Sequence, residues 1–308
     1  MIVVTGASGL LGASVLLHAR DLGHEVAGLC HSHPLQVPGT SMHSVDLTDF
    51  AAARMLLLGL RPQTIIHCAA ATSVDWCEDH RHEAEMINVH ASAHLAETAG
   101  DLNANFVYIS TDAVFDGRQG NYSETDDPSP VNVYGHSKLS GEREVLKRHP
   151  SALIVRINIY GWNAQNKTSL AEWFLQGLEK QKQVPGFTDV TFCPMLVNDL
   201  AEVLFKMLDQ QLSGIYHVVG SERISKYEFG RRVAMAFGLD PRKVVATAAA
   251  EANLKARRPL DISLCTEKVR QALGVAMPNV EAGLSRFQTL YREGYPQQLR
   301  SYLTGVAV

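Results

Sequence analysis

The sequence predicts a doubly wound α/β fold built on a parallel sheet. Apolar segments of strand length alternate with helical segments through the first half of the chain. Most of these apolar segments are hydrophobic throughout, as expected for strands that helices cover on both faces. A glycine-rich turn follows the first strand and leads into the first helix. Together these observations predict a Rossmann-type sheet with right-handed crossovers.

The elements of the first half follow from this alternation. Each strand is a short apolar run, and each helix is a longer stretch in which apolar and polar residues mix. A further strand is expected just before Asp46. The other strands are predicted at 2–5, 25–30, 64–67, 105–110 and 152–157, and the helices at 9–22, 48–59, 79–99 and 134–148.

The alternation becomes less regular in the second half, which predicts a smaller, partly interleaved C-terminal lobe. Residues 1–156 are expected to form the Rossmann domain and residues 157–308 the second region, with segments such as 190–220 returning to the sheet. Asn198 is expected to cap a helix. The remaining elements are predicted as helices at 169–181, near Ser225, near Thr266 and at 281–293, with extended segments at 191–194 and 214–220.

Composition excludes several classes of protein. The chain has 308 residues, 46% of them hydrophobic, and a net charge of −4, which gives no general electrostatic reason to bind nucleic acid or an acidic membrane. Its five cysteines lack paired CxxC spacing, so a disulfide framework or a structural zinc site is not expected. No signal-type segment and no apolar run of about 18 residues is present. The prediction is a soluble, cytoplasmic protein.

The turn TGASGLLG at 5–12 predicts a dinucleotide site. Gly6, Gly9 and Gly12 stand at GxxGxxG spacing between the first strand and the first helix. Glycines there permit a tight turn, a close approach of the backbone to a pyrophosphate, and close packing of the helix on the sheet. The phosphates would lie at the helix N-terminus, where free N–H groups favour an anion. The alternative is a glycine-rich turn without a ligand.

The end of the second strand bears on which dinucleotide binds. An NAD-binding protein usually has Asp or Glu there, but this chain reads LCHSH, in which His31, Ser32 or His33 could donate to a 2′-phosphate. NADP(H) is therefore preferred and NAD(H) stays open. Asp46 is expected near the adenine, or alternatively as a helix N-cap. The cofactor-binding residues are predicted as Gly6, Ser8, Gly9, Leu10, Leu11, His31, Ser32, Asp46, Leu47, Cys68, Ala69, Ala70, Ser110, Tyr134 and Lys138.

A catalytic set is predicted at the carboxyl edge of the sheet. YISTDAVFDG at 108–117 ends a strand with Ser110 and Thr111, and Tyr134 and Lys138 follow four residues apart on one helix face. Reduction of a ketone requires a hydride to carbon and a proton to oxygen. A neighbouring ammonium is expected to move the phenol's pKa toward neutrality, and a hydroxyl would hold the carbonyl oxygen. The alternative is an ordinary polar helix start.

With these motifs, and with VRINIYG and RRPLDISL, the chain resembles the extended short-chain dehydrogenase/reductase family. Within it, the chain is similar to the dTDP-4-dehydrorhamnose reductase branch, over nearly its whole length. The resemblance implies a nicotinamide cofactor and a catalytic set of Thr111, Tyr134 and Lys138. Thr111 is chosen over Ser110 because the STD element of the family carries the hydroxyl on its threonine.

The resemblance also points to the substrate. Sugar-nucleotide dehydratases place Glu after their Thr-Asp pair, whereas this chain has Ala113, which argues against a dehydratase. Thr111, Asp112 and Ala113 are expected near the substrate. Arg258 is expected either to hold a nucleotide-sugar diphosphate or to form a surface salt bridge with Glu251 or Asp261.

Three functions stay open on the sequence. The first is an NADPH-dependent reductase of a 4-keto nucleotide sugar, and the second is a nucleotide-sugar epimerase, which uses the same Tyr and Lys. The third is a cofactor-binding regulatory subunit like the beta subunit of methionine adenosyltransferase, which resembles the same branch. The resemblance also allows a homodimer, and no cluster of metal ligands is expected.

Overall fold

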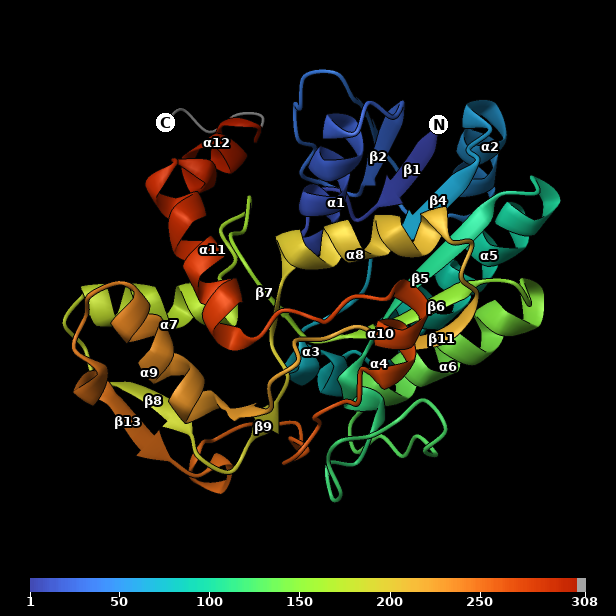
Figure 1. Ribbon diagram of the computed structural model, residues 1–308. Helices are drawn as coiled ribbons and strands as arrows, with labels where there is room; N and C mark the ends of the chain where they lie inside the picture. The colour runs from blue at the N-terminus through green and yellow to red at the C-terminus, as the bar shows by residue number, and fades with distance from the viewer. Residues whose placement is uncertain (304–308) are drawn as a thin grey trace.

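The computed structural model describes residues 1–303. Its centre is a seven-stranded sheet in the order β11-β6-β5-β4-β1-β2-β3, and every pair of neighbouring strands is parallel (Figure 1). The predicted fold class is confirmed. The strands are β1 (Ile2–Thr5), β2 (Val26–Cys30), β3 (Ser41–Ser44), β4 (Thr64–His67), β5 (Asn105–Thr111), β6 (Leu153–Ile157) and β11 (Gly214–His217).

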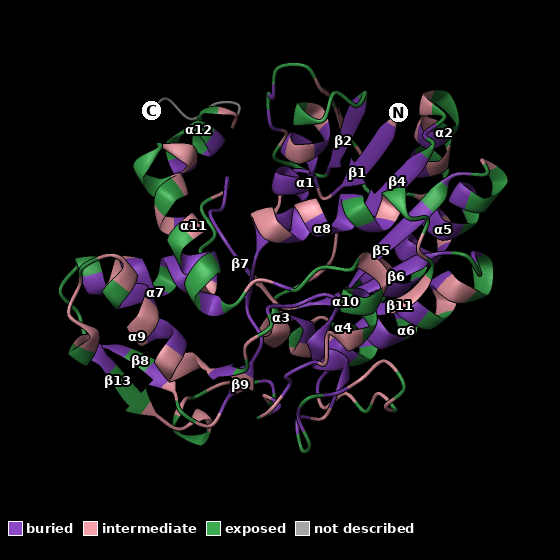
Figure 2. Cartoon of the chain, viewed as in Figure 1, coloured by how far each residue is buried: buried purple, intermediate pink, exposed green. Residues whose placement is uncertain are grey.

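The strand order reverses beside β1, and this reversal positions the site. β1 pairs with β2 on one side and with β4 on the other, so the chain builds the sheet outward in both directions from β1. In open α/β sheets the crevice at such a reversal, beyond the carboxyl ends of the strands, is where ligands bind. Strands β1, β2, β4 and β6 are buried along their whole length, and β5 is buried from Phe106 onward (Figure 2).

Two layers of helices cover the sheet. α1 (Leu10–Asp21) and α8 (Val197–Asp209) lie against each other on one face, and their buried residues belong to the larger apolar core. α2 (Phe50–Leu60), α5 (Ser92–Asp101) and α6 (Val133–Arg148) pack on the other face around a second core. None of the helices within residues 1–303 has the length and apolar content needed to span a bilayer.

The helix predicted at 79–99 is divided in the structure. α4 (Arg81–Glu85) leads into a π-helical turn, η1 (Met86–Ala91), before α5 begins, and a separate α3 (Val74–Asp79) precedes α4. Within the turn, the carbonyl of Asn88 accepts hydrogen bonds from the hydroxyls of Tyr108 and Ser92. The widened π-helical turn leaves this backbone carbonyl accessible to the Tyr108 side chain of β5. Helical periodicity in the sequence does not predict such a tertiary contact.

The second lobe is a smaller body beside the carboxyl edge of the sheet (Figure 1). Here α9 (Lys226–Ala236) packs against α7 (Leu170–Glu179), α11 (Val280–Arg292) and the parallel pair of β8 (Val184–Phe187) and β13 (Val244–Thr247). In contrast, β11 and α8 lie on the main sheet. The N-cap predicted at Asn198 is wrong: α8 begins at Val197, and the Asn198 amide instead donates to the Tyr295 hydroxyl. The elements are β7 (Ile159–Tyr160), α7 (Leu170–Glu179), β8 (Val184–Phe187), β9 (Thr191–Phe192), β10 (Met195–Leu196), β12 (Ile224–Ser225), α9 (Lys226–Ala236), β13 (Val244–Thr247), α10 (Glu267–Leu273), α11 (Val280–Arg292) and α12 (Tyr295–Ser301).

Candidate active site

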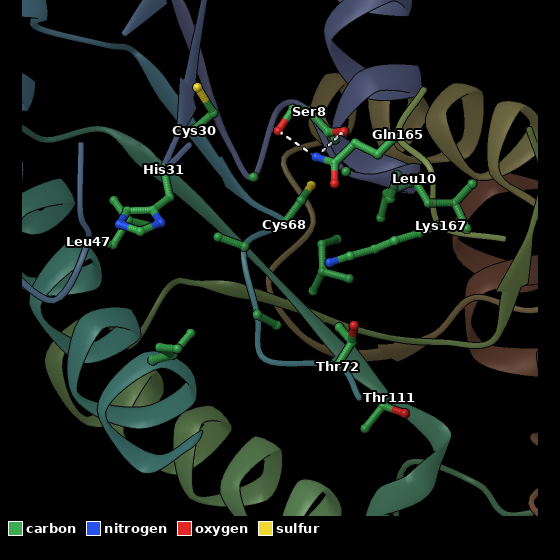
Figure 3. A pocket seen from close by; sticks show the side chains of 18 of the residues that line it. Ser8, Leu10, Cys30, His31, Leu47, Cys68, Thr72, Thr111, Gln165 and Lys167 are labelled. Atoms are coloured by element: carbon green, nitrogen blue, oxygen red, sulfur yellow. Dashed lines mark hydrogen bonds between the residues drawn. The ribbon is translucent and has the colours of Figure 1, made fainter. Parts of the chain in front are cut away.

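A cavity of about 1100 Å³ runs along the carboxyl edge of the sheet, from the glycine turn to the N-terminus of α6 (Figure 3). Every residue predicted to contact the cofactor lines it, as do Thr111 and Asp112. These residues come from five strand ends and from α1 and α6, so the fold gathers at one place groups that are far apart in the sequence. Ala113 and Arg258 are not part of the lining.

The glycine turn leaves no room for a side chain at Gly6 or at Gly12. Gly6 has a φ of +61°, and a Cβ atom there would lie 2.7 Å from the backbone nitrogen of Ala69. At Gly12, a Cβ would lie 2.1 Å from the carbonyl oxygen of Gly6. Gly9 caps α1 without a side-chain hydrogen bond to the first turn. The N–H groups at the start of α1 are thus left without a side-chain partner beside the cavity, which suits a bound phosphate.

The end of β2 offers imidazole and hydroxyl groups and no carboxylate of its own. His31 is exposed, and its Nε2 lies 3.8 Å from Oδ2 of Asp46 on the loop after β3. Asp46 accepts hydrogen bonds from the hydroxyl and the N–H of Thr48, at 2.7 and 2.9 Å, and these bonds lower its pKa. Asp49, and not Asp46, caps α2, because it accepts from the N–H of Ala52. Asp46 is therefore not the N-cap of α2.

Asn88 fixes the small-residue loop that follows β4. Its side chain accepts from the N–H of Ala71 at 2.8 Å and donates to the carbonyl of Ala71 at 3.1 Å. The same amide donates to the hydroxyl of Ser137 on α6, at 2.9 Å. The loop with Cys68 and Ala69 is thereby tied to the helix that carries Tyr134 and Lys138, and the width of the cavity between them is fixed.

The three residues of the predicted catalytic set line the same end of the cavity. Asn132 caps α6 by accepting from the N–H of Gly135, which places Tyr134 in the first turn of the helix. Lys138, one turn later, donates from Nζ to the carbonyl of Ile109 at 2.8 Å and lies 4.0 Å from the centroid of the Tyr108 ring. Thr111 ends β5 opposite them.

The ionisation of Tyr134 differs from the expectation. Burial raises the pKa of the phenol above its ordinary value, and only a hydrogen bond with Thr111 opposes this. Burial also lowers the pKa of Lys138 to about 7, against the attraction of the Glu142 carboxylate. The predicted shift of the phenol's pKa toward neutrality is wrong, because desolvation of the buried phenol raises its pKa and the nearby Asp112 carboxylate adds to this. At neutral pH Tyr134 is a protonated phenol, suited to donate a proton.

Two hydroxyls end β5, and the structure separates their roles. Ser110 donates to the Glu142 carboxylate at 2.5 Å. Thr111 donates to Asp112 and accepts from the N–H of Ala113, each at 3.1 Å, so its hydroxyl stays beside the Tyr134 phenol. The buried Asp112 also accepts from the Asn158 amide, and burial raises its pKa to about 6.

Arg258 pairs with Asp75, and not with Glu251 or Asp261 as expected. Its guanidinium forms an ion pair with Asp75 at 3.0 Å and also donates to the carbonyl of Ala256. Asp261 pairs with Arg223 instead. Ala113 is buried, and its carbonyl lies 2.3 Å from where a Cβ on Gly135 would be, so it packs directly against the start of α6.

One wall of the cavity was not expected from the sequence. Residues 163–169, between β7 and α7, contribute Gln165 and Lys167 to the lining, and Figure 3 shows both side chains reaching into it. The one signal in the sequence was Ser169-x-x-Glu172, a capping box that marks where the segment ends and α7 begins.

The chain is similar in sequence to a known family and to curated proteins. The family model described as RmlD substrate binding domain matches residues 1–292. A probable low-salt glycan biosynthesis reductase, Agl14, of Haloferax volcanii is 34% identical over 296 residues, covering 94% of this chain and 98% of that protein. Methionine adenosyltransferase 2 subunit beta of Danio rerio is also 34% identical, covering 85% of this chain and 82% of its own length.

The fold is also similar to that of a solved structure. The dTDP-4-dehydrorhamnose reductase of Bacillus anthracis, in complex with NADP, superposes with a TM-score of 0.84 at 27% identity. The match covers 93% of this chain and 97% of the other. The parallel sheet, the glycine turn and the match over nearly the whole chain show that this protein belongs to the RmlD substrate binding domain family.

Proposed function

We propose that the protein is an NADPH-dependent reductase that acts on the keto group of a 4-keto nucleotide sugar. The observation that carries this proposal is one continuous cavity, with the bare glycine turn at one end and Thr111, Tyr134 and Lys138 at the other. The same three residue types form the catalytic set of the short-chain dehydrogenase/reductases that the sequence resembles. The relatives named as reductases, and the one solved with NADP, support the same reading.

The residues around the turn fit a dinucleotide. The positions of Gly6 and Gly12 leave no room for side chains, and the N-terminus of α1 offers N–H groups without side-chain partners. When bound there, NADPH would supply the hydride. His31 and Ser32 stand where a 2′-phosphate would lie, and no carboxylate on β2 repels it, which favours NADPH over NADH.

Each catalytic residue has one role in the proposed reaction. Tyr134, protonated at neutral pH, gives its proton to the keto oxygen as that oxygen gains charge. Thr111 holds the same oxygen through its hydroxyl. Lys138, fixed by the Ile109 carbonyl, orients the nicotinamide ribose and stabilises the phenolate that proton donation leaves.

The test is turnover by the purified protein. NADPH oxidation is followed with a panel of 4-keto-6-deoxy nucleotide sugars, and the Tyr134→Phe variant is expected to lose at least about 10²-fold in kcat, the usual contribution of a positioned acid. The variant should bind NADPH as the wild type does, because the lost hydroxyl faces the substrate carbonyl. Absence of turnover over the whole panel and over simpler ketones would refute the proposal.

A second candidate function is supported by the 34% identity with the beta subunit of methionine adenosyltransferase 2 over 85% of this chain. In this alternative the protein binds its cofactor and acts by associating with another enzyme. A stoichiometric enzyme partner in a pull-down, together with no turnover of any ketone, would favour it. Turnover that depends on Tyr134 would exclude it as the main function.

We also propose that the protein works in the cytoplasm and assembles as a homodimer. All five cysteines are free thiols, as expected in a reducing compartment. Light scattering on the purified protein tests the assembly, and a mass corresponding to the 33.7 kDa monomer would refute the dimer.

A further inference from the structure

Residues 163–169, which we name the strap, pass from β7 to α7 beside the glycine turn. Glu172 holds both ends: its carboxylate accepts from the N–H of Asn163 at 3.2 Å and from the N–H of Ser169 at 2.8 Å. Ser169 closes the base with a bond from its hydroxyl to the Gly161 carbonyl at 2.6 Å. The base of the strap is therefore fixed by buried hydrogen bonds.

The strap is fastened to the glycine turn as well. The Gln165 amide donates to both the carbonyl and the hydroxyl of Ser8, each at 3.0 Å (Figure 3). Ser8 lies inside the turn, directly before Gly9 at the start of α1. This contact joins a segment of the second lobe to the place where the backbone would meet a phosphate, and it sets the position of the residues that follow Gln165.

Lys167 extends from the strap into the cavity, which Leu10 and Thr72 also line (Figure 3). Within residues 1–303 its ammonium has no ion pair and no hydrogen bond, although most charged side chains near the site do. Lys138 is the other lysine in the lining, no arginine lines the described cavity, and Lys138 already donates to the Ile109 carbonyl. The cavity thus holds one unengaged ammonium on the side of the glycine turn.

We propose that Lys167 binds the pyrophosphate of the dinucleotide and that the strap lies over the bound cofactor. This inference rests on the proposed cofactor. The N-terminus of α1 supplies N–H groups and a partial positive charge, but a diphosphate carries full negative charges that these groups do not neutralise. An ammonium on a flexible stem, two residues from the contact with Ser8, supplies that charge. Lys167 is a cofactor-binding residue in this proposal and takes no part in proton transfer.

Binding measurements with NADPH test the inference on the full chain. Lys167→Gln is expected to raise the Kd for NADPH about tenfold, the effect of one lost charge-assisted contact, and Lys167→Arg should bind like the wild type. Lys182→Gln is the matched control, because Lys182 is also exposed but lies after α7 outside the cavity. Loss of the charge should also make binding by Lys167→Gln less sensitive to salt than binding by the wild type.

A second measurement does not depend on a variant. Acetic anhydride labels exposed lysines, and mass spectrometry should show that NADPH protects Lys167 at least severalfold while Lys182 is labelled equally with and without the cofactor. Equal labelling of Lys167 in both samples, or an unchanged Kd in Lys167→Gln, would overturn the inference.

The outcomes separate this inference from the proposed function. If the wild type binds no NADPH by either measurement, both fail together. If it binds NADPH and reduces a keto sugar but Lys167→Gln binds equally well, only the role of Lys167 fails. In the third case Lys167→Gln weakens binding of dTDP but not of NADPH. The ammonium then serves the diphosphate of the substrate, and the assignment to the cofactor is wrong.

Discussion

Glu142 and Arg156 form a bidentate ion pair beneath the carboxyl end of β5. Arg156 donates from Nη2 to Oε2 at 2.7 Å and from Nε to Oε1 at 3.0 Å, and each side chain is only 2% exposed. The same carboxylate accepts from Ser110, and Arg156 also contacts His217 on β11 at 3.3 Å. The pair joins α6, which carries Tyr134 and Lys138, to β6 of the sheet.

Breaking this pair should destabilise the protein strongly. Glu142→Gln leaves a buried guanidinium without its counter-charge, and the expected loss in the free energy of unfolding is about 3–5 kcal/mol. Urea denaturation of the variant and the wild type measures it. The single variants Glu142→Leu and Arg156→Met each leave one buried charge unpaired. The double variant Glu142→Leu/Arg156→Met should therefore lose less free energy of unfolding than the sum of these two single losses, because no charge then remains unpaired. Additive losses would contradict this account.

The close packing of the glycine turn predicts a sharp contrast between two glycines. Gly12→Ala places a methyl group 2.1 Å from the Gly6 carbonyl, so we expect a loss of about 1–3 kcal/mol or more and weaker NADPH binding. Gly59→Ala, in α2 with open space around it, should stabilise the protein by about 0.5 kcal/mol. Thermal denaturation and NADPH titration distinguish them. Normal cofactor binding by Gly12→Ala would contradict the assigned turn.

The end of β2 predicts a change in cofactor preference. His31→Asp introduces a carboxylate where NAD-binding sites hold the ribose diol, so the Kd for NADPH should rise about tenfold or more while NADH binds at least as well as before. His31→Gln is the neutral control and should weaken NADPH less. Fluorescence titrations with both cofactors measure the ratio, and an unchanged ratio in His31→Asp would place the 2′-phosphate elsewhere.

Two buried histidines predict loss of stability in acid. Burial lowers the pKa of His67 and of His217 to about 3. Between pH 6.5 and 3 the unfolded chain binds more protons than the folded one, so the free energy of unfolding falls as pH falls through this range. From pH 6.5 to 5, each histidine contributes a loss of about 2 kcal/mol.

Urea denaturation at several pH values checks this dependence. His67→Gln removes one of the two groups and should make the decrease shallower, whereas His24→Gln, at an exposed position, should leave it unchanged. An identical decrease in wild type and His67→Gln would show that other groups cause the acid sensitivity.

Much of the site could be predicted because its residues stand at recognisable places along the chain. Strand ends of a parallel sheet meet at one edge, so the turn after β1, the loop after β4 and Thr111 at the end of β5 had to converge. The residues expected around the cofactor accordingly line one cavity. Local signals failed where a long-range contact decided the outcome, as at Asn198, whose side chain binds Tyr295 and does not cap α8.

By itself, the sequence determined the doubly wound sheet, the glycine turn and the order of the candidate catalytic residues, because periodicity, turn chemistry and spacing are properties of neighbouring residues. Only the tertiary structure decided the ionisation of Tyr134 and Lys138 and the placement of Lys167 in the cavity. Desolvation depends on every atom packed around a group, and the approach of the strap to Ser8 joins residues that lie more than 150 positions apart.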